Sequence, residues 1–418
     1  MKKLPKSLKK QLLNLTFVVV LIAITITVLI VNFKEDGLSF ENIGAFFGSA
    51  NPYYIVAAFG CMVLFVLFEA FALLFIARKL GHKSKLYQSI AYAASDSYYS
   101  AITPSATGGQ PASAFYMARD GMGAGKASFA LVVNLVGHSF AIVFTGVMAL
   151  ILRPDMFSAI GNSFAQALII FGAVIQVLLL GLFIACMFFG KVILKIGNWL
   201  IRVLTKIKII KKPEKWQRKL EIEVEKFRSC RSEIKNHPSA IIASLIFNVL
   251  QRTAQFLIPV FICLSVKPDS DVLTLFSAQV LVFYGYSCVP IPGGVGAYEL
   301  MYYNIYALHP GYDNSFILVA MMISRVIQYY ICMLITGIYT WVYHMVGVKE
   351  GRIKADEGVG DDEDEQLQIE SEKPCPESDA ATETTDEDSP SAQIENDADD
   401  PGGGFTELET ATEGAELN

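Results

Sequence analysis

Long apolar runs bounded by charged and polar residues occupy most of the first 350 residues of the chain. A helix needs about 20 apolar residues to cross the roughly 30 Å hydrocarbon core of a bilayer. Six runs reach that length: residues 13–33, 53–77, 127–152, 164–190, 239–266 and 313–346. The pattern predicts an all-α integral membrane protein with about six full transmembrane helices.

Two further apolar stretches, residues 87–118 and 272–308, contain clusters of Pro and Gly within otherwise helical sequence. Pro cannot donate a backbone hydrogen bond, and Gly permits turns that other residues resist. Each stretch is therefore predicted to form a re-entrant hairpin of helix, break and helix, which enters and leaves the membrane on one side. The residues assigned to the two breaks are Pro104, Gly108, Gly109, Pro290, Pro292, Gly293, Gly294 and Gly296.

The distribution of Lys and Arg predicts the orientation. With the N-terminus in the cytoplasm, the inner segments carry 25 of these residues, whereas the outer loops carry Lys34, Arg153 and Lys267. The first hairpin then opens to the cytoplasm and the second to the outside. Broken helices in this opposed arrangement are typical of an inverted-repeat transporter with its site where the two halves meet. Two purely structural hairpins are the alternative.

Composition supports a membrane protein and divides the chain into two regions. Hydrophobic residues make up 53% of the sequence, charged residues 18%, and the mean hydropathy is +0.42. Residues 350–418 hold 24 acidic and 3 basic residues, a charge of −21, so the overall −6 leaves +15 for residues 1–349. We expect a membrane domain over residues 1–348, including a basic amphipathic segment at 191–237, and a disordered acidic cytoplasmic tail over 349–418. These values exclude a soluble enzyme and a disulfide scaffold.

Charged side chains at membrane depth are costly, so each one needs a function or a partner. An arginine is suited to a phosphodiester, because its planar guanidinium donates two parallel hydrogen bonds and keeps its charge. Arg252 and Arg325 are the preferred phosphate ligands. Structural ion pairs, Arg252 with Glu299 or Arg325 with Asp96 or Glu69, are the alternative. The full set of predicted substrate-binding residues is Arg252, Arg325, Glu299, Asp96, Glu69, Gln110 and Thr103.

Two other groups of residues are given structural roles. His138 lies among apolar residues and is interpreted as a buried bundle residue rather than a proton relay. The run from Tyr302 to Tyr306 is assigned to the aromatic belt at the membrane interface, with the wall of a headgroup site as the alternative.

The two breaks also carry a family resemblance. The run Thr103-Pro-Ser-Ala-Thr-Gly-Gly-Gln-Pro111, the following Tyr116-Met-Ala-Arg-Asp-Gly121 and the second run Pro290-Ile-Pro-Gly-Gly-Val-Gly-Ala-Tyr-Glu299 resemble the lysylphosphatidylglycerol synthase transmembrane, or flippase-like, family over about residues 10–347. The positions that match its motifs are Thr103, Pro104, Gly108, Gly109, Gln110, Pro290, Pro292, Gly293, Gly294 and Glu299.

The resemblance implies a function in lipid handling. Two-domain members of that family join a membrane module, which moves lysylated phosphatidylglycerol between leaflets, to a cytosolic transferase that uses lysyl-tRNA. Stand-alone members often carry the name phosphatidylglycerol lysyltransferase and are linked to resistance against cationic antimicrobial peptides. Neither the 191–237 segment nor the acidic tail is expected to form that transferase.

The leading hypothesis is therefore a phospholipid translocase of the cell membrane, acting on lysyl-phosphatidylglycerol or a related anionic or aminoacylated lipid. The alternatives are a lysyltransferase or its membrane subunit, a transporter of small anions or polyprenyl phosphates, and a scaffold acting through the tail. A separate cytosolic lipid-modifying enzyme is an expected partner. No cofactor, metal or nucleic acid is expected, because the sequence has no motif for them.

Overall fold

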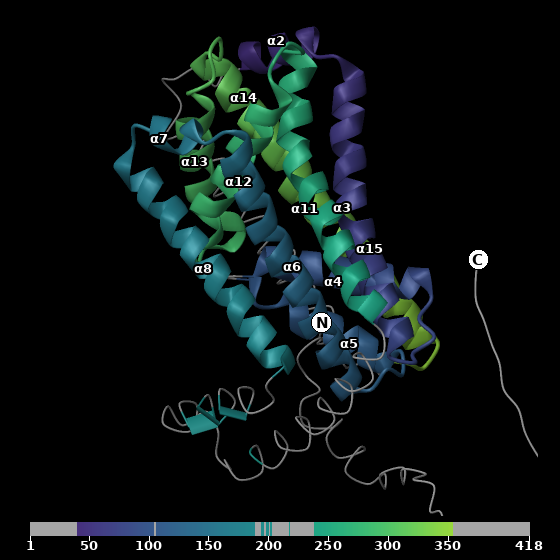
Figure 1. Cartoon of the computed structure of the whole chain (residues 1–418). Coiled ribbons are helices and arrows are strands. Elements are labelled where there is room, and N and C mark those ends of the chain that lie inside the picture. Colours follow the sequence, from purple (N-terminus) through teal and green to yellow (C-terminus); the bar gives the residue numbers. More distant parts are fainter. Residues whose placement is uncertain are drawn as a thin grey trace, which may run out of the picture. The chain divides into compact units, whose positions relative to one another are not determined.

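The computed structural model describes residues 40–103, 106–188 and 238–353, with a few isolated residues between 194 and 217. Every regular element in these ranges is a helix (Figure 1). The predicted span at 13–33, Pro104, most of the 191–237 segment and nearly all of the acidic tail lie outside the described residues. The elements are α2 (Phe40–Ser49), α3 (Pro52–Lys79), α4 (Leu86–Ile102), α5 (Gly109–Arg119), α6 (Ala124–Leu152), α7 (Asp155–Ala159), α8 (Ser163–Phe188), α11 (Pro238–Val266), α12 (Val272–Ser287), the 3-10 turn η2 (Pro292–Gly294), α13 (Ala297–Tyr306), α14 (Asn314–Arg325), the π-helical turn η3 (Val326–Ile331) and α15 (Cys332–Lys349).

Five of the six predicted spans are confirmed as helices long and apolar enough to cross a membrane. They are α3, α6, α8, α11 and the continuous run of α14, η3 and α15. Large apolar side chains are exposed along α8, among them Ile170, Phe171 and Val174. Such a surface is stable only against lipid or another apolar partner. The described part of the chain is thus an all-α membrane protein.

Polar caps mark one end of the bundle, which we call the capped end. Asn51, Asp271 and Asp313 begin α3, α12 and α14, each accepting a backbone N–H within its own first turn. The backbone N–H of Asn51 donates to the carbonyl of Ser265 at 2.7 Å, so α3 begins where α11 ends. The opposite end, the basic end, carries basic side chains from the last turns of α3, α5 and α15, from the α3–α4 loop and from the start of α6: Arg78, Lys79, Lys83, Lys85, Arg119, Lys126 and Lys349.

The two predicted hairpins are present and enter the bundle from opposite ends. Because α3 and α11 run antiparallel, the α4–α5 hairpin that follows α3 starts at the basic end. The α12–η2–α13 hairpin that follows α11 starts at the capped end (Figure 1). The order of long helix, broken hairpin and long helix therefore occurs twice in opposite directions. This is the inverted arrangement expected from the sequence.

Glycine is required at both breaks. The backbone of Gly293 has φ +63°, and an added Cβ would lie 2.5 Å from the ring of Tyr329. Gly109 allows a close approach instead, because a Cβ there would lie 1.9 Å from Oδ1 and 2.7 Å from the backbone carbonyl oxygen of Asp96. In the first break, the Thr103 hydroxyl donates to the Tyr99 carbonyl at 2.7 Å and accepts from the Gly108 N–H at 2.9 Å. These contacts hold the chain where regular helix stops.

The interfacial belt predicted for the run from Tyr302 to Tyr306 is wrong for Tyr302 and Tyr306. Tyr302 and Tyr306 are at most 1% exposed, and their rings stack with centroids 3.9 Å apart. The helix that carries them, α13, packs against α12 and α14 within the protein. Tyrosines suit an interface and a protein interior alike, so their composition did not distinguish the two.

Candidate functional site

A pair of carboxyl groups occupies the interior between α3 and α4. Glu69 is 5% exposed, Asp96 is partly buried, and the two carboxyl groups lie within hydrogen-bonding reach of each other. Gln251 Nε2 donates to Glu69 Oε2 at 3.0 Å, and Gln110 Nε2 donates to Asp96 Oδ2 at 3.0 Å. Helices α3, α4, α5 and α11 thus converge on this pair. Three predicted site residues, Glu69, Asp96 and Gln110, come together here.

Arg252 lies beside the carboxyl pair, one residue along α11 from Gln251. Its side chain donates to Gln255 Oε1 and lies 2.6 Å from Nε2 of His138 on α6. Its guanidinium also covers the ring of Phe283, 4.9 Å from the centroid. A guanidinium is only a donor, so the facing nitrogen of His138 must be the unprotonated one.

The partners of Arg252 are therefore all neutral. Arg252 is 4% exposed, yet no carboxylate in the described ranges lies within ion-pair distance of it. Its Nε atom has no hydrogen-bond partner. A buried cation without a contacting counter-ion is costly, because desolvation is offset only by a well-placed anion. Arg252 thus has the environment of a residue that binds an anion.

Arg325 has a different environment, although the sequence grouped it with Arg252. Its Nε lies 3.6 Å from Glu299 Oε1, and its Nη2 donates to the backbone carbonyl of Gly293. The guanidinium lies over the rings of Tyr298 and Tyr329, at 4.6 and 4.8 Å from their centroids. Arg325 therefore anchors the second break to α13 and α14 as one member of a buried ion pair.

Glu299 completes that anchor. Its Oε2 accepts the N–H of Gly296 at 2.6 Å, at the start of α13. The carboxylate thus neutralises the arginine and caps the helix that follows the break. Of the structural ion pairs considered from the sequence, the structure contains neither Arg252 with Glu299 nor Arg325 with Asp96 or Glu69, and the pair that forms is Arg325 with Glu299.

The two breaks meet through Tyr329, which lies on the π-helical turn η3. Its hydroxyl donates to the carbonyl of Ala101, at the end of α4, at 2.8 Å, while its ring packs on Gly293. Turn η2 also contacts α4 directly. A π-helical turn inside a long helix often occurs at a functional position. Gly109 of the first break also approaches Asp96, so the junction between the hairpins lies next to the carboxyl pair.

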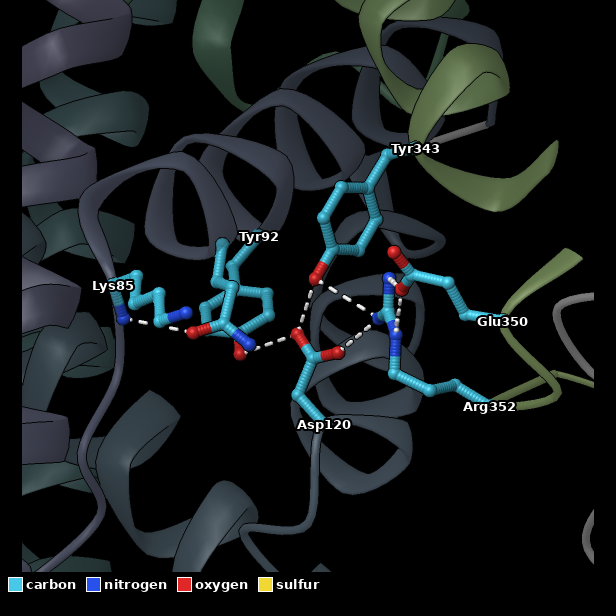
Figure 2. A network of polar contacts seen from close by, with 7 residues as sticks. Lys85, Tyr92, Asp120, Tyr343, Glu350 and Arg352 are labelled. Atoms are coloured by element: carbon cyan, nitrogen blue, oxygen red, sulfur yellow. Dashed lines mark hydrogen bonds and ion pairs between the residues drawn. The ribbon is translucent and has the colours of Figure 1, made fainter. Parts of the chain in front are cut away.

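A second polar cluster, which sequence reasoning missed, joins helices at the basic end (Figure 2). The carboxylate of Asp120 is fully buried and accepts from the hydroxyl of Tyr92 at 2.7 Å, from the hydroxyl of Tyr343 and from Arg352. We call these four residues the basic-end cluster. Asp120 stands in the Tyr116–Gly121 motif, which was the available signal. Its partner Arg352 is 232 positions away, so sequence spacing could not reveal the pair.

One pocket lies away from all of these residues. It has a volume of about 230 Å³ and lies at the capped end between α7, α12 and α13. Its lining includes Met156, Asp271, Thr274 and Tyr306, none of which was predicted as a site residue.

A family model for the lysylphosphatidylglycerol synthase TM region matches residues 18–336, about three quarters of the chain. The chain belongs to this family. It is also similar to a UPF0104 membrane protein of Archaeoglobus fulgidus, with 26% identity over 293 residues. That alignment covers 69% of this chain and 85% of the relative.

The region matched by the family model contains both broken hairpins, the carboxyl pair and both buried arginines. The basic-end cluster is divided by its boundary. Tyr92 and Asp120 lie inside the match, whereas Tyr343 and Arg352 lie beyond residue 336. The family match and the long apolar helices together make the chain a multi-pass membrane protein of a lipid-synthase-related family.

Proposed function

We propose that the protein is a phospholipid translocase, which moves a headgroup through the polar interior between the two opposed hairpins. The observation that carries the proposal is the environment of Arg252, a buried guanidinium whose contacting partners in the described structure are neutral. A phosphodiester fits it, because two phosphate oxygens match the geometry of a guanidinium.

The carboxyl pair supports a headgroup that also carries an amine. Glu69 and Arg252 are close enough to interact electrostatically, and Gln251 joins their environments along α11. A zwitterionic or aminoacylated headgroup would place its phosphate at Arg252 and its ammonium group at Glu69 and Asp96. Lysyl-phosphatidylglycerol has both groups, in agreement with the family to which the chain belongs.

The proposed setting is the plasma membrane, with the basic end in the cytoplasm. The positive-inside rule supports this orientation, because Lys and Arg gather at one end of the bundle. A separate cytosolic enzyme that aminoacylates the lipid would act on the same side, and export of the product would contribute to resistance against cationic antimicrobial peptides.

Lipid movement in liposomes tests the proposal. The full chain is reconstituted, and loss of fluorescently labelled lipid from the inner leaflet is followed for lysyl-phosphatidylglycerol, phosphatidylglycerol and a glycolipid without phosphate. Transport of the phosphate-containing lipids should exceed the rate in empty liposomes. Arg252→Met should lower it by about 30-fold, the equivalent of about 2 kcal/mol for one charge-assisted contact.

Lys83→Met is the matched control, because it removes an exposed positive charge at the basic end. It should transport at the wild-type rate. Failure of the wild-type chain to move any of the lipids above the empty-liposome rate would refute the proposal. An Arg252→Met variant as active as the control would show that Arg252 does not bind the transported lipid.

A second candidate, transport of small anions or polyprenyl phosphates, is favoured by the same feature of Arg252, because that residue would recognise a phosphate whatever its tail. Uptake of labelled inorganic phosphate and of a short polyprenyl phosphate by the same liposomes separates it from the lipid proposal. Expression of the chain alone in a host that lacks lysyl-phosphatidylglycerol tests the remaining lysyltransferase alternative, which predicts that this lipid appears.

A further inference from the structure

The Glu69–Asp96 pair has an arrangement that two ionised carboxylates could not keep. Two negative charges in contact repel each other strongly where no water screens them. Two carboxyl groups can form a hydrogen bond with each other only when one of them carries a proton. In the described ranges, no basic side chain lies within ion-pair distance of either group. The hydrogen-bond donors that face the pair are the neutral groups of Gln251, Gln110 and Ser100, the last at 3.3 Å from Asp96 Oδ1.

A second observation, separate from the acidic groups, points to a ligand with hydrogen-bond donors. Gln251 is 1% exposed, and its amide is held against Glu69 through Nε2. Its Oε1 is buried near the ring of His138 and has no hydrogen-bond partner of standard geometry. Gln110, which holds Asp96 in the same way, also has a buried Oε1 without a partner. Acceptor oxygens without donors, next to carboxyl groups, match an ammonium group with three N–H donors.

The charged and titratable groups around the pair are few. Arg252 faces it from α11 with His138 of α6 behind, and the thiol of Cys332 faces it from α15. With one proton the pair has a charge of −1. With an ammonium group in place of that proton, the two carboxylates and their ligand again have a charge of −1. The exchange therefore leaves the electrostatic balance with Arg252 unchanged, which avoids the cost of a new net charge inside the bundle.

We propose that the Glu69–Asp96 pair is a proton-exchange site, which gives up one bound proton when the ammonium group of a lipid headgroup binds. Asp96 is partly exposed and Glu69 is buried, so the proton leaves and returns through Asp96. The three N–H groups of the ammonium then donate to the two carboxylates and to an amide oxygen of Gln251 or Gln110. This inference rests on the proposed lipid function and deepens it, because it couples binding of the headgroup to release of a proton.

Proton release is measured with purified full-length protein in detergent, by a pH-indicator dye in weak buffer. The probes are lysyl-phosphatidylglycerol, phosphatidylethanolamine, free lysinamide and, as the probe without an amine, phosphatidylglycerol. The wild-type protein should release one proton for each amine-containing molecule bound, and none for phosphatidylglycerol. The probe that is active shows whether the amine must belong to a lipid.

Variants test whether the released proton comes from the Glu69–Asp96 pair. Glu69→Gln and Asp96→Asn should release no proton, whereas Glu41→Gln, an exposed carboxyl group on α2, should release as much as the wild-type protein. If the two site variants do not fold, the infrared carbonyl band of a protonated carboxyl group is followed in the wild-type protein. That band should be present without ligand and disappear when an amine binds.

The absence of proton release with all three amines, or a carboxyl band that an amine leaves unchanged, would overturn the exchange. Equal release by Glu69→Gln and the wild-type protein would do the same. Because these measurements need no liposomes, they are distinct from the transport assay: a protein that moves lipids without releasing protons keeps the proposed function and loses this inference. A protein that moves no lipid fails the proposed function itself.

Discussion

The contrast between the two buried arginines leads to a prediction about stability. Replacing Arg325 by Met keeps a long apolar side chain and removes the guanidinium. Glu299, which is 2% exposed, would then be a buried carboxylate without its counter-ion. Breaking a buried ion pair by removing one partner lowers the free energy of unfolding by about 3–5 kcal/mol.

The other contacts of Arg325 act in the same direction. The carbonyl of Gly293 loses a charge-assisted donor, and the rings of Tyr298 and Tyr329 lose a cation between them. Each of these interactions contributes about 0.5–3 kcal/mol in isolation. They share one side chain and are not additive, so we expect a total loss of about 3–5 kcal/mol for Arg325→Met.

The assay is unfolding of the purified chain in mixed micelles of increasing SDS content, followed by fluorescence. Arg153→Met is the matched control, since Arg153 pairs with Asp271 where both side chains are more than 40% exposed. Exposed pairs contribute about 0–1 kcal/mol. The double variant Arg325→Met, Glu299→Gln should be less destabilised than the sum of the single variants by about 1–3 kcal/mol. An Arg325→Met loss no larger than that of Arg153→Met, or strict additivity, would refute the anchoring role.

Two further predictions use the same unfolding assay. Gly293→Ala should lower the free energy of unfolding by about 2–5 kcal/mol, because strain at positive φ adds to a clash with the Tyr329 ring. Gly311→Ala is the control, because Gly311 has φ +82° but open space around it, and it should lower the free energy of unfolding by only about 1–2 kcal/mol. Equal losses in the two variants would exclude the clash. Asp120→Asn should lower the free energy of unfolding by about 1–3 kcal/mol, because it replaces a buried carboxylate that accepts three hydrogen bonds with a neutral amide that has one acceptor oxygen. Glu350→Gln, at the exposed partner of Arg352, should lie within about 0.5 kcal/mol of the wild-type value, and a loss in Glu350→Gln equal to that in Asp120→Asn would contradict a special role for the buried carboxylate.

Much of the fold was predictable because its signals are local. Hydrophobic length predicted the spans of α3, α6, α8 and α11 to within a few residues, and Pro and Gly predicted both breaks. Opposite entry of the hairpins followed from the charge distribution, since each loop must lie on one side of the membrane or the other. Each of these features depends on a short window of sequence and on the properties of the bilayer.

The sequence predicted the candidate site only as a set of charged residues whose burial in the membrane is costly. Arg252, Arg325, Glu69, Asp96 and Glu299 stood out because charge at membrane depth needs a reason. The sequence treated both arginines alike, and His138 was interpreted as an ordinary bundle residue. The structure places His138 against Arg252 and separates the arginines into one paired with a carboxylate and one whose contacts are neutral. Whether any of them binds substrate stays a prediction.

By itself, the sequence determined which segments are long and apolar enough to cross a membrane, where the helices break and which side chains are expensive to bury. Only the tertiary structure decided which of those side chains meet, because the deciding contacts join distant positions: Gln251 with Glu69 across 182 residues, and Asp120 with Arg352 across 232. The physical reason is that burying a charge has a cost that depends on residue type and depth. The compensation depends on which atoms the packed helices bring within about 3 Å.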